Sequence, residues 1–226
     1  MDVVIFDCDG VLVDSEILAL QVLSRELAPL LPSINTTALL HNTAGIHTEA
    51  ILEMVQQRTG QTLPPGAVSA IIRAIDRALD EELQPIPGAL EAIERIPACK
   101  AVASNSSLAS VRRSLKRAGL TRYFDERVFS ADMVAEPKPA PDLYLHAAEQ
   151  LGVIPGRCLV IEDSVPGTIA ARLAGMTVIG FTGASHVPVD QHERLRHAGA
   201  AVVIDRMEGL PELVNGWPLV AEGAES

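Results

Sequence analysis

Two aspartates near the start of the chain lie in a pattern that could do chemistry. Asp7 and Asp9 flank Cys8 directly after the apolar run 3–6. Two carboxylates at positions i and i+2 of an extended segment point to the same side. Such a pair can hold a hard divalent cation through oxygen, and one of its members can act as a nucleophile. Alone, the pattern is more typical of a turn with two solvated acids.

Three further polar groups follow other apolar runs. Ser104 and Asn105 precede a helical segment, whose free N–H groups could bind an anion. Lys138 stands between two prolines, in a chain that has only three lysines against 15 arginines. Glu162 and Asp163 end another apolar run. Each group alone is explained by a helix cap or a rigid loop. Four such groups at strand ends favour one composite site.

The apolar runs before these groups predict the strands of a parallel sheet. Short continuous runs are typical of strands that are buried on both faces. Strands that alternate with helices predict a doubly wound α/β fold, in which ligands bind at the carboxyl ends of the strands. The predicted strands are 3–6, 101–103, 127–129, 158–161, 176–179 and 201–204, and the predicted helices between them are 88–96, 107–119, 141–151 and 165–174.

One long segment interrupts the alternation of strands and helices. Residues 15–84 contain no apolar strand run, and their pattern predicts helices at about 15–31, 35–41, 47–59 and 66–83. We therefore predict an α/β core domain formed by 1–14 and 85–226, with an all-helical domain, 15–84, inserted after the first strand.

Composition excludes several classes of function. The formal net charge of −11 argues against a nucleic-acid-binding surface, which needs a basic patch. No apolar stretch is suited to span a membrane, and no basic leader precedes the first aspartates. Three widely spaced cysteines form neither a disulfide framework nor a zinc-binding spacing. We expect a cytoplasmic protein with no nucleic acid, membrane or obligate protein as its partner.

Taken together, the polar groups and their surroundings resemble the haloacid dehalogenase-like (HAD) superfamily, in the branch with a helical cap after the first strand. The matching stretches are Phe6–Glu16, Ala103–Ser106, Glu136–Pro141 and Ile161–Gly167. The resemblance covers nearly the whole chain. It is specific for the superfamily and the branch, and poorly specific for the substrate. It implies a Rossmann-like core and an inserted helical cap.

The resemblance also implies roles for the acidic residues. Asp7 would attack phosphorus and become an aspartyl-phosphate, and Asp9 would protonate the leaving alcohol and then take a proton from the hydrolytic water. Mg²⁺ would be held by Asp7, the Asp9 carbonyl and Asp163, with Glu162 beside or behind it.

Further residues would bind the substrate. Ser104, the Asn105 backbone and Lys138 would bind the phosphoryl oxygens. The cap loop 43–49 would face the leaving group, with His47 and Thr48 as candidate contacts. Positive charge from Mg²⁺ and Lys138 is reasonable in an acidic protein, since phosphoryl transfer needs positioning and charge neutralisation.

Residue types separate the known relatives. Asp9 argues against a dehalogenase, which needs no second acid there, and residues 15–84 hold no lysine for the Schiff base of a phosphonoacetaldehyde hydrolase. A β-phosphoglucomutase-like enzyme has cations in its cap, where this chain has Ala19, Ala44 and Thr48.

We therefore favour a phosphatase for a small phosphorylated metabolite, a sugar or sugar-acid monophosphate. The chain looks most like the 6-phosphogluconate phosphatase-like group, and phosphoglycolate phosphatase-like enzymes are also similar. The alternatives are a β-phosphoglucomutase-like phosphosugar mutase and a phospho-accepting receiver-type signalling module.

Overall fold

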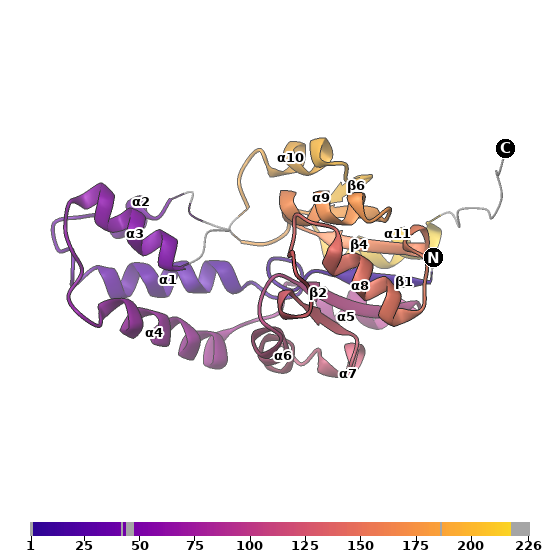
Figure 1. Cartoon of the computed structure of the whole chain (residues 1–226), viewed down its shortest axis with the longest axis horizontal. Helices are drawn as coiled ribbons and strands as arrows, with labels where there is room; N and C mark the ends of the chain where they lie inside the picture. Colours follow the sequence, from indigo (N-terminus) through magenta and orange to yellow (C-terminus); the bar gives the residue numbers. More distant parts are fainter. Residues whose placement is uncertain (1, 42, 44–47, 186, 218–226) are drawn as a thin grey trace. The chain divides into compact units, whose positions relative to one another are not determined.

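The structure, a computed structural model, describes residues 2–41, 43, 48–185 and 187–217. The described residues divide into two compact units, one within Met1–Val13 and Pro85–Ser226 and the other within Asp14–Gln84. The first contains a sheet flanked by helices, and the second contains only helices (Figure 1). None of the helices in the described ranges has both the length and the apolar composition of a transmembrane span.

The sheet of the first unit has six parallel strands in the order β3-β2-β1-β4-β5-β6. The first strand is central: Phe6 lies opposite Val102 of β2 on one side and Ile161 of β4 on the other. The predicted doubly wound α/β fold is therefore confirmed. The strands are β1 (Val3–Phe6), β2 (Cys99–Ser104), β3 (Val128–Ser130), β4 (Cys158–Glu162), β5 (Thr177–Phe181) and β6 (Val202–Ile204).

The helices of this unit cover both faces of the sheet, which explains why the inner strands lack polar alternation. Figure 1 shows α8 and α9 across the front of the strands, and Leu143 and Ala170 from these helices pack with Ile5. On the other face, Phe124 of α7 meets Phe6 edge to face. The helices are α5 (Ala89–Arg95), α6 (Leu108–Arg117), α7 (Thr121–Phe124), α8 (Asp142–Leu151), α9 (Val165–Leu173), α10 (Gln191–Ala198) and α11 (Leu210–Gly216), with short 3₁₀ turns at Ala131–Met133, Pro155–Arg157 and Met207–Gly209.

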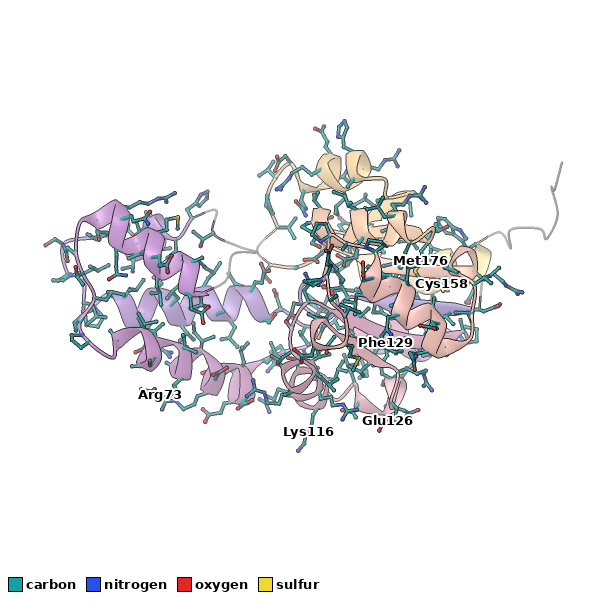
Figure 2. The ribbon with its side chains drawn as sticks, viewed as in Figure 1. Arg73, Lys116, Glu126, Phe129, Cys158 and Met176 are labelled. Atoms are coloured by element: carbon teal, nitrogen blue, oxygen red, sulfur yellow. The ribbon has the colours of Figure 1, made fainter. Side chains whose placement is uncertain are left out.

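Many alanines lie among the larger side chains of the core layer under α8 and α9. Phe129, Cys158 and Met176, labelled in Figure 2, belong to it together with several alanines. Alanine allows helix and sheet backbones to approach closely, which explains how a chain with only 3% aromatic residues forms a dense core.

The helical unit builds a core of its own. Val22 and Leu27 of its first helix pack with Leu52, Ile71 and other apolar side chains. Its helices are α1 (Ser15–Leu27), α2 (Thr36–Leu39), α3 (Thr48–Thr59) and α4 (Ala67–Glu82), so the all-helical insert between the first two strands is confirmed. The first helix ends at Leu27 rather than 31, because Pro29 cannot continue its hydrogen-bond ladder.

The two segments that join the units run side by side. Val13 bridges to Pro85, and the Ile86 N–H donates to the Leu12 carbonyl at 2.9 Å. The Asp14 N–H donates to the Gln84 carbonyl at 3.2 Å. Entry into the helical unit and return from it are thus tied together.

Candidate active site

The two aspartates of the first motif lie at the carboxyl end of β1. The Asp7 N–H donates to the Ile161 carbonyl at 2.9 Å and thereby extends the β1–β4 pairing by one residue. Asp7 is buried and Asp9 is half-buried. After Asp9 the chain turns back on itself, because the Gly10 N–H donates to the Val13 carbonyl at 2.9 Å. The chain after β1 therefore places Asp7 in the interior and Asp9 closer to the surface.

Gly10 allows the loops after β1 and β4 to approach each other closely. Its φ of +76° is a left-handed conformation that favours glycine. A Cβ atom at this position would lie 1.9 Å from Oδ2 of Asp163. The absence of a side chain thus leaves space for the Asp163 carboxylate beside the first loop.

Lys138 binds both acidic strand ends at once. Its Nζ donates to Asp7 Oδ1 at 2.7 Å, to Glu162 Oε1 at 2.6 Å and to the Ala103 carbonyl at 2.8 Å. These contacts use all three N–H donors of the ammonium. Burial lowers the pKa of Lys138, but Asp7, Glu162 and Tyr144 outweigh burial and raise the pKa well above its usual value. The ammonium is therefore a fixed positive charge.

Asn105 fixes the loop that carries this lysine. Its side-chain amide donates to the Lys138 carbonyl at 3.0 Å, and its Oδ1 accepts from the Lys138 N–H at 3.0 Å. This reciprocal pair joins the loop after β2 to the loop after β3. The Asn105 side chain therefore serves to place Lys138, a function that is separate from the predicted role of its backbone.

Glu162 is completely buried and surrounded by donors. Oε1 accepts from Lys138 and from the Tyr144 hydroxyl at 2.9 Å, while Oε2 accepts from the N–H of Ser164 at 3.1 Å and its hydroxyl at 2.9 Å. A carboxylate offers about four lone-pair positions, and four donors occupy them here. A Cβ on Gly167 would lie 1.8 Å from Oε1, so glycine is needed beside this carboxylate. Glu162 is bound as the counter-ion of Lys138.

Asp7, Glu162 and Asp163 form an acidic cluster. Each offers one carboxylate oxygen, and these three oxygens lie within 4.8 Å of one another. Carboxylate oxygens are the ligands that hard divalent cations prefer, so the donor set fits Mg²⁺. Because Glu162 is saturated by its donors, Asp7 and Asp163 are the better-suited direct ligands. Gln191 of α10 supports this loop, since its Nε2 donates to the Asp163 carbonyl at 2.5 Å.

The pKa of Asp7 is raised by its burial and by the neighbouring carboxylates. Burial raises the pKa of Asp7 strongly, Lys138 opposes this effect, and Glu162 and Asp9 raise the pKa further, to about 8. A nucleophilic carboxylate must be ionised. A cation held by the acidic cluster would favour the ionised form of Asp7.

Two serines at the end of β2 meet Asp9. The Ser106 hydroxyl donates to Asp9 Oδ2 at 2.8 Å, and the Ser104 hydroxyl lies 3.4 Å from the same oxygen. The Ser104 Oγ also accepts from the Ser106 N–H at 3.1 Å. The loop after β2 thus gives the second acid two hydroxyl neighbours.

The structure brings most of the predicted site together within the α/β unit. At the carboxyl edge of its sheet lie Asp7, Asp9, Ser104, Asn105, Lys138, Glu162 and Asp163. Thr48 begins α3 in the helical unit, so its part in binding the substrate stays a prediction. His47 lies outside the described residues. The Thr43 hydroxyl donates to the Leu40 carbonyl at 2.7 Å, a hydrogen bond within its own turn.

Sequence reasoning missed four residues that support this site, namely Ser106, Tyr144, Ser164 and Gln191. Ser106 and Ser164 directly follow predicted site residues, and this position could have indicated that they belong to the site. Tyr144 resembles an ordinary core aromatic in its helix. Gln191 lies 28 residues from its partner, and nothing in its local sequence points to Asp163.

Comparison with protein families matches residues 1–175 to the family described as haloacid dehalogenase-like hydrolase. The chain belongs to this family. The HAD-like match includes every residue of the core site and confirms the resemblance seen in the motifs. It also removes the receiver-type signalling module from the alternatives.

Similar proteins narrow the group within the HAD-like hydrolases. The chain is 28% identical over 224 residues to 6-phosphogluconate phosphatase of Escherichia coli, covering 98% of this chain and 99% of that protein. It is 34% identical over 184 residues to hexitol phosphatase B of Escherichia coli, covering 77% and 81%. A crystal structure of a HAD family hydrolase from Deinococcus radiodurans with bound phosphate and sodium is 34% identical, with a TM-score of 0.82 and 93% of each chain covered. The prediction of a HAD-like phosphatase is thereby confirmed.

Proposed function

We propose that this HAD-like protein is a Mg²⁺-dependent phosphatase that hydrolyses a sugar or sugar-acid monophosphate through a phosphorylated Asp7. The observation that carries the proposal is the contact of 2.7 Å between Lys138 and Asp7, at the edge of the acidic cluster. A nucleophile, a fixed cation and a cation-binding cluster are the parts that phosphoryl transfer requires.

The residues of the α/β unit support a distinct role for each part. Asp7 attacks phosphorus, and the Lys138 ammonium beside it stabilises negative charge as the phosphoryl group arrives. Asp7 and Asp163 would hold the metal together with the Asp9 carbonyl, and Glu162 would keep Lys138 in place. A bound Mg²⁺ supplies neutralising charge to the phosphoryl oxygens. Ser104 and the Asn105 N–H are positioned at the end of β2, where an anion can bind at a chain turn.

Asp9 completes the reaction as acid and base. In the first step the O–P ester bond breaks, the phosphoryl group bonds to Asp7, and the Asp9 proton moves to the leaving oxygen. In the second step water attacks the phosphoryl group, gives its proton to Asp9, and releases Asp7 and phosphate. Its half-buried position at the rim suits contact with the leaving group.

The helical unit would act as a cap that selects the substrate. Residues 43–49 contain no Lys or Arg, so a second phosphate would find neither of these cationic side chains there. The uncharged Thr48 begins α3, and a helix N-terminus favours an anion such as a carboxylate. His47 and Thr48 are the proposed contacts. The names of the two Escherichia coli relatives, which refer to a sugar-acid phosphate and to hexitol phosphates, support this substrate class.

A substrate panel tests the proposal directly. Purified protein with Mg²⁺ is assayed for released phosphate with 6-phosphogluconate, a hexitol phosphate, a hexose bisphosphate, a nucleotide and p-nitrophenyl phosphate. We expect monophosphorylated sugars or sugar acids to have the highest kcat/KM. Asp7→Asn, in which an amide replaces the nucleophile, serves as the inactive control.

Two outcomes would contradict this proposal. Isomerisation of a sugar phosphate without net release of phosphate would instead support the mutase. A preference for bisphosphates would overturn the interpretation of the cap while leaving the core chemistry intact. Variants His47→Ala and Thr48→Val test the role of the cap separately from the core chemistry. They should change the substrate ranking more than they change turnover of p-nitrophenyl phosphate.

A further inference from the structure

Ser106 makes the shorter of the two hydroxyl contacts to the second aspartate. Its Oγ lies 2.8 Å from Asp9 Oδ2, whereas Ser104 Oγ lies 3.4 Å from the same atom. Ser106 is half-buried and immediately follows the residues expected to bind phosphate. It is part of a motif whose other polar residues have a role in the proposed reaction.

The backbone of Ser106 acts on Ser104. The Ser106 N–H donates to Ser104 Oγ at 3.1 Å and occupies one of its lone pairs. The Ser104 hydroxyl has a single proton to donate. If that proton turns to a phosphoryl oxygen, Ser104 gives up its long contact with Asp9. Ser106 is then the hydroxyl of this loop that still holds Asp9.

We propose that Ser106 is a positioning residue that holds the Asp9 carboxyl group through Oδ2 and so orients it for proton exchange with the leaving group. This inference rests on the proposed function, in which Asp9 is the acid and base. As the O–P bond breaks, the electron pair of that bond stays on the leaving oxygen, which takes the proton from Asp9. The carboxylate formed on Asp9 is stabilised by the Ser106 hydroxyl, since hydrogen bonds to charged groups are among the stronger ones.

The role predicts a dependence on the leaving group. An alkyl phosphate needs a proton on its leaving oxygen, whereas p-nitrophenolate leaves readily without one. Ser106→Ala should lower kcat/KM for an alkyl monophosphate, which reports the step in which the leaving group departs, by about 10- to 100-fold, the scale of one hydrogen bond to a charged group. The same variant should lower kcat/KM for p-nitrophenyl phosphate by less than about 3-fold, because its leaving group needs little protonation in that step.

Matched variants separate positioning from a structural effect. Ser106→Thr keeps the hydroxyl and should restore kcat/KM for the alkyl monophosphate to within about 5-fold of the wild type. Ser107→Ala removes the neighbouring hydroxyl, which accepts from the Ser110 N–H at 3.3 Å and caps α6. That control should leave the ratio of the two kcat/KM values unchanged. In the double variant Ser106→Ala/Asp9→Asn, loss of the serine should add little to the loss from Asp9→Asn, because a hydroxyl that acts through Asp9 has nothing left to position.

The experiment distinguishes failure of this inference from failure of the proposed function. Equal losses with both substrates, or additive losses in the double variant, would overturn the role of Ser106 while Asp9→Asn still shows the leaving-group dependence. If Asp9→Asn itself affects both substrates equally, the acid–base assignment fails and the inference fails with it.

Discussion

Removal of the Lys138 ammonium gives the sharpest test of how this site is held together. Lys138→Met keeps the length of the side chain but deletes the charge that pairs with Asp7 and Glu162. Glu162 is fully buried, and its side chain cannot reach water without disrupting Tyr144 and Ser164. Truncation of one partner of a buried ion pair costs about 3–5 kcal/mol, because the remaining charge is left unpaired.

The expected loss is large for a protein of this size. Folded proteins are stable by roughly 5–15 kcal/mol, so the variant should retain only part of its free energy of unfolding. At roughly 2–4 °C per kcal/mol for a chain of this length, the melting temperature should fall by about 6–20 °C. Urea unfolding of metal-free protein, followed by circular dichroism, measures the change.

Two variants serve as matched controls. Lys116→Met deletes an exposed lysine of α6 and should change stability by less than about 0.5 kcal/mol. Lys138→Met/Glu162→Gln removes both charges of the buried pair and should regain much of the lost stability without regaining activity, because the cation beside Asp7 is still missing.

The penalty should also depend on pH in a defined direction. The pKa of Asp7 is raised to about 8 in the folded protein, and loss of Lys138 removes the interaction that lowers it. The folded state then holds a proton that the unfolded state releases near pH 4, so stability falls as pH rises from about 4 to beyond 8. The variant should therefore be closest to the wild type near pH 5. A cost below about 1 kcal/mol at pH 8, or a double variant as unstable as Lys138→Met, would refute the argument from buried charge.

Two further predictions concern the acidic cluster. Gly10→Ala forces a side chain into a left-handed conformation at a cost of about 1–2 kcal/mol and displaces the Asp163 carboxylate; we expect a raised Mg²⁺ requirement, measured by titrating activity with Mg²⁺, and an unchanged requirement would show that Asp163 tolerates displacement. Treatment with a chelator should abolish phosphate release and added Mg²⁺ should restore it, with Asp163→Ala needing far more Mg²⁺ than wild type; full activity of the stripped protein would remove the metal from the proposed function.

The sheet and its polar edge could be predicted from the sequence for a physical reason. Buried parallel strands appear as continuous apolar runs, and their carboxyl ends meet at one edge of the sheet. Residues as distant in sequence as Asp7 and Glu162 are therefore brought to one edge by topology, whereas Lys138, in the loop after β3, is placed there with the help of Asn105. The helical insert was visible for a related reason, since 15–84 lacks such runs.

Other features depend on tertiary contacts that leave no local pattern. Helix α10 has the sequence QHERLRHA, with only Gln191 and Leu195 buried, so it has no apolar stripe from which a helix could be predicted. The sequence also contained no indication of which group Glu162 binds. An acid at a strand end can bind a metal or a lysine, and the difference here lies in the donors that Tyr144 and Ser164 supply. Those donors come from α8 and from the turn before α9, which the folded chain alone brings to the carboxylate.

The paired crossing between the two units has a consequence for how such a protein can diversify. Leu12 and Ile86 are hydrogen-bonded neighbours, so 14–84 leaves the α/β unit and returns to it at a single point. A segment with adjacent ends can be exchanged for another without rethreading the strands. The residues proposed for the chemistry all lie outside that segment. The proposed catalytic residues and the proposed substrate contacts can therefore be changed independently, and a chimaera that joins this α/β unit to a relative's insert at 13 and 85 would test whether the insert selects the substrate.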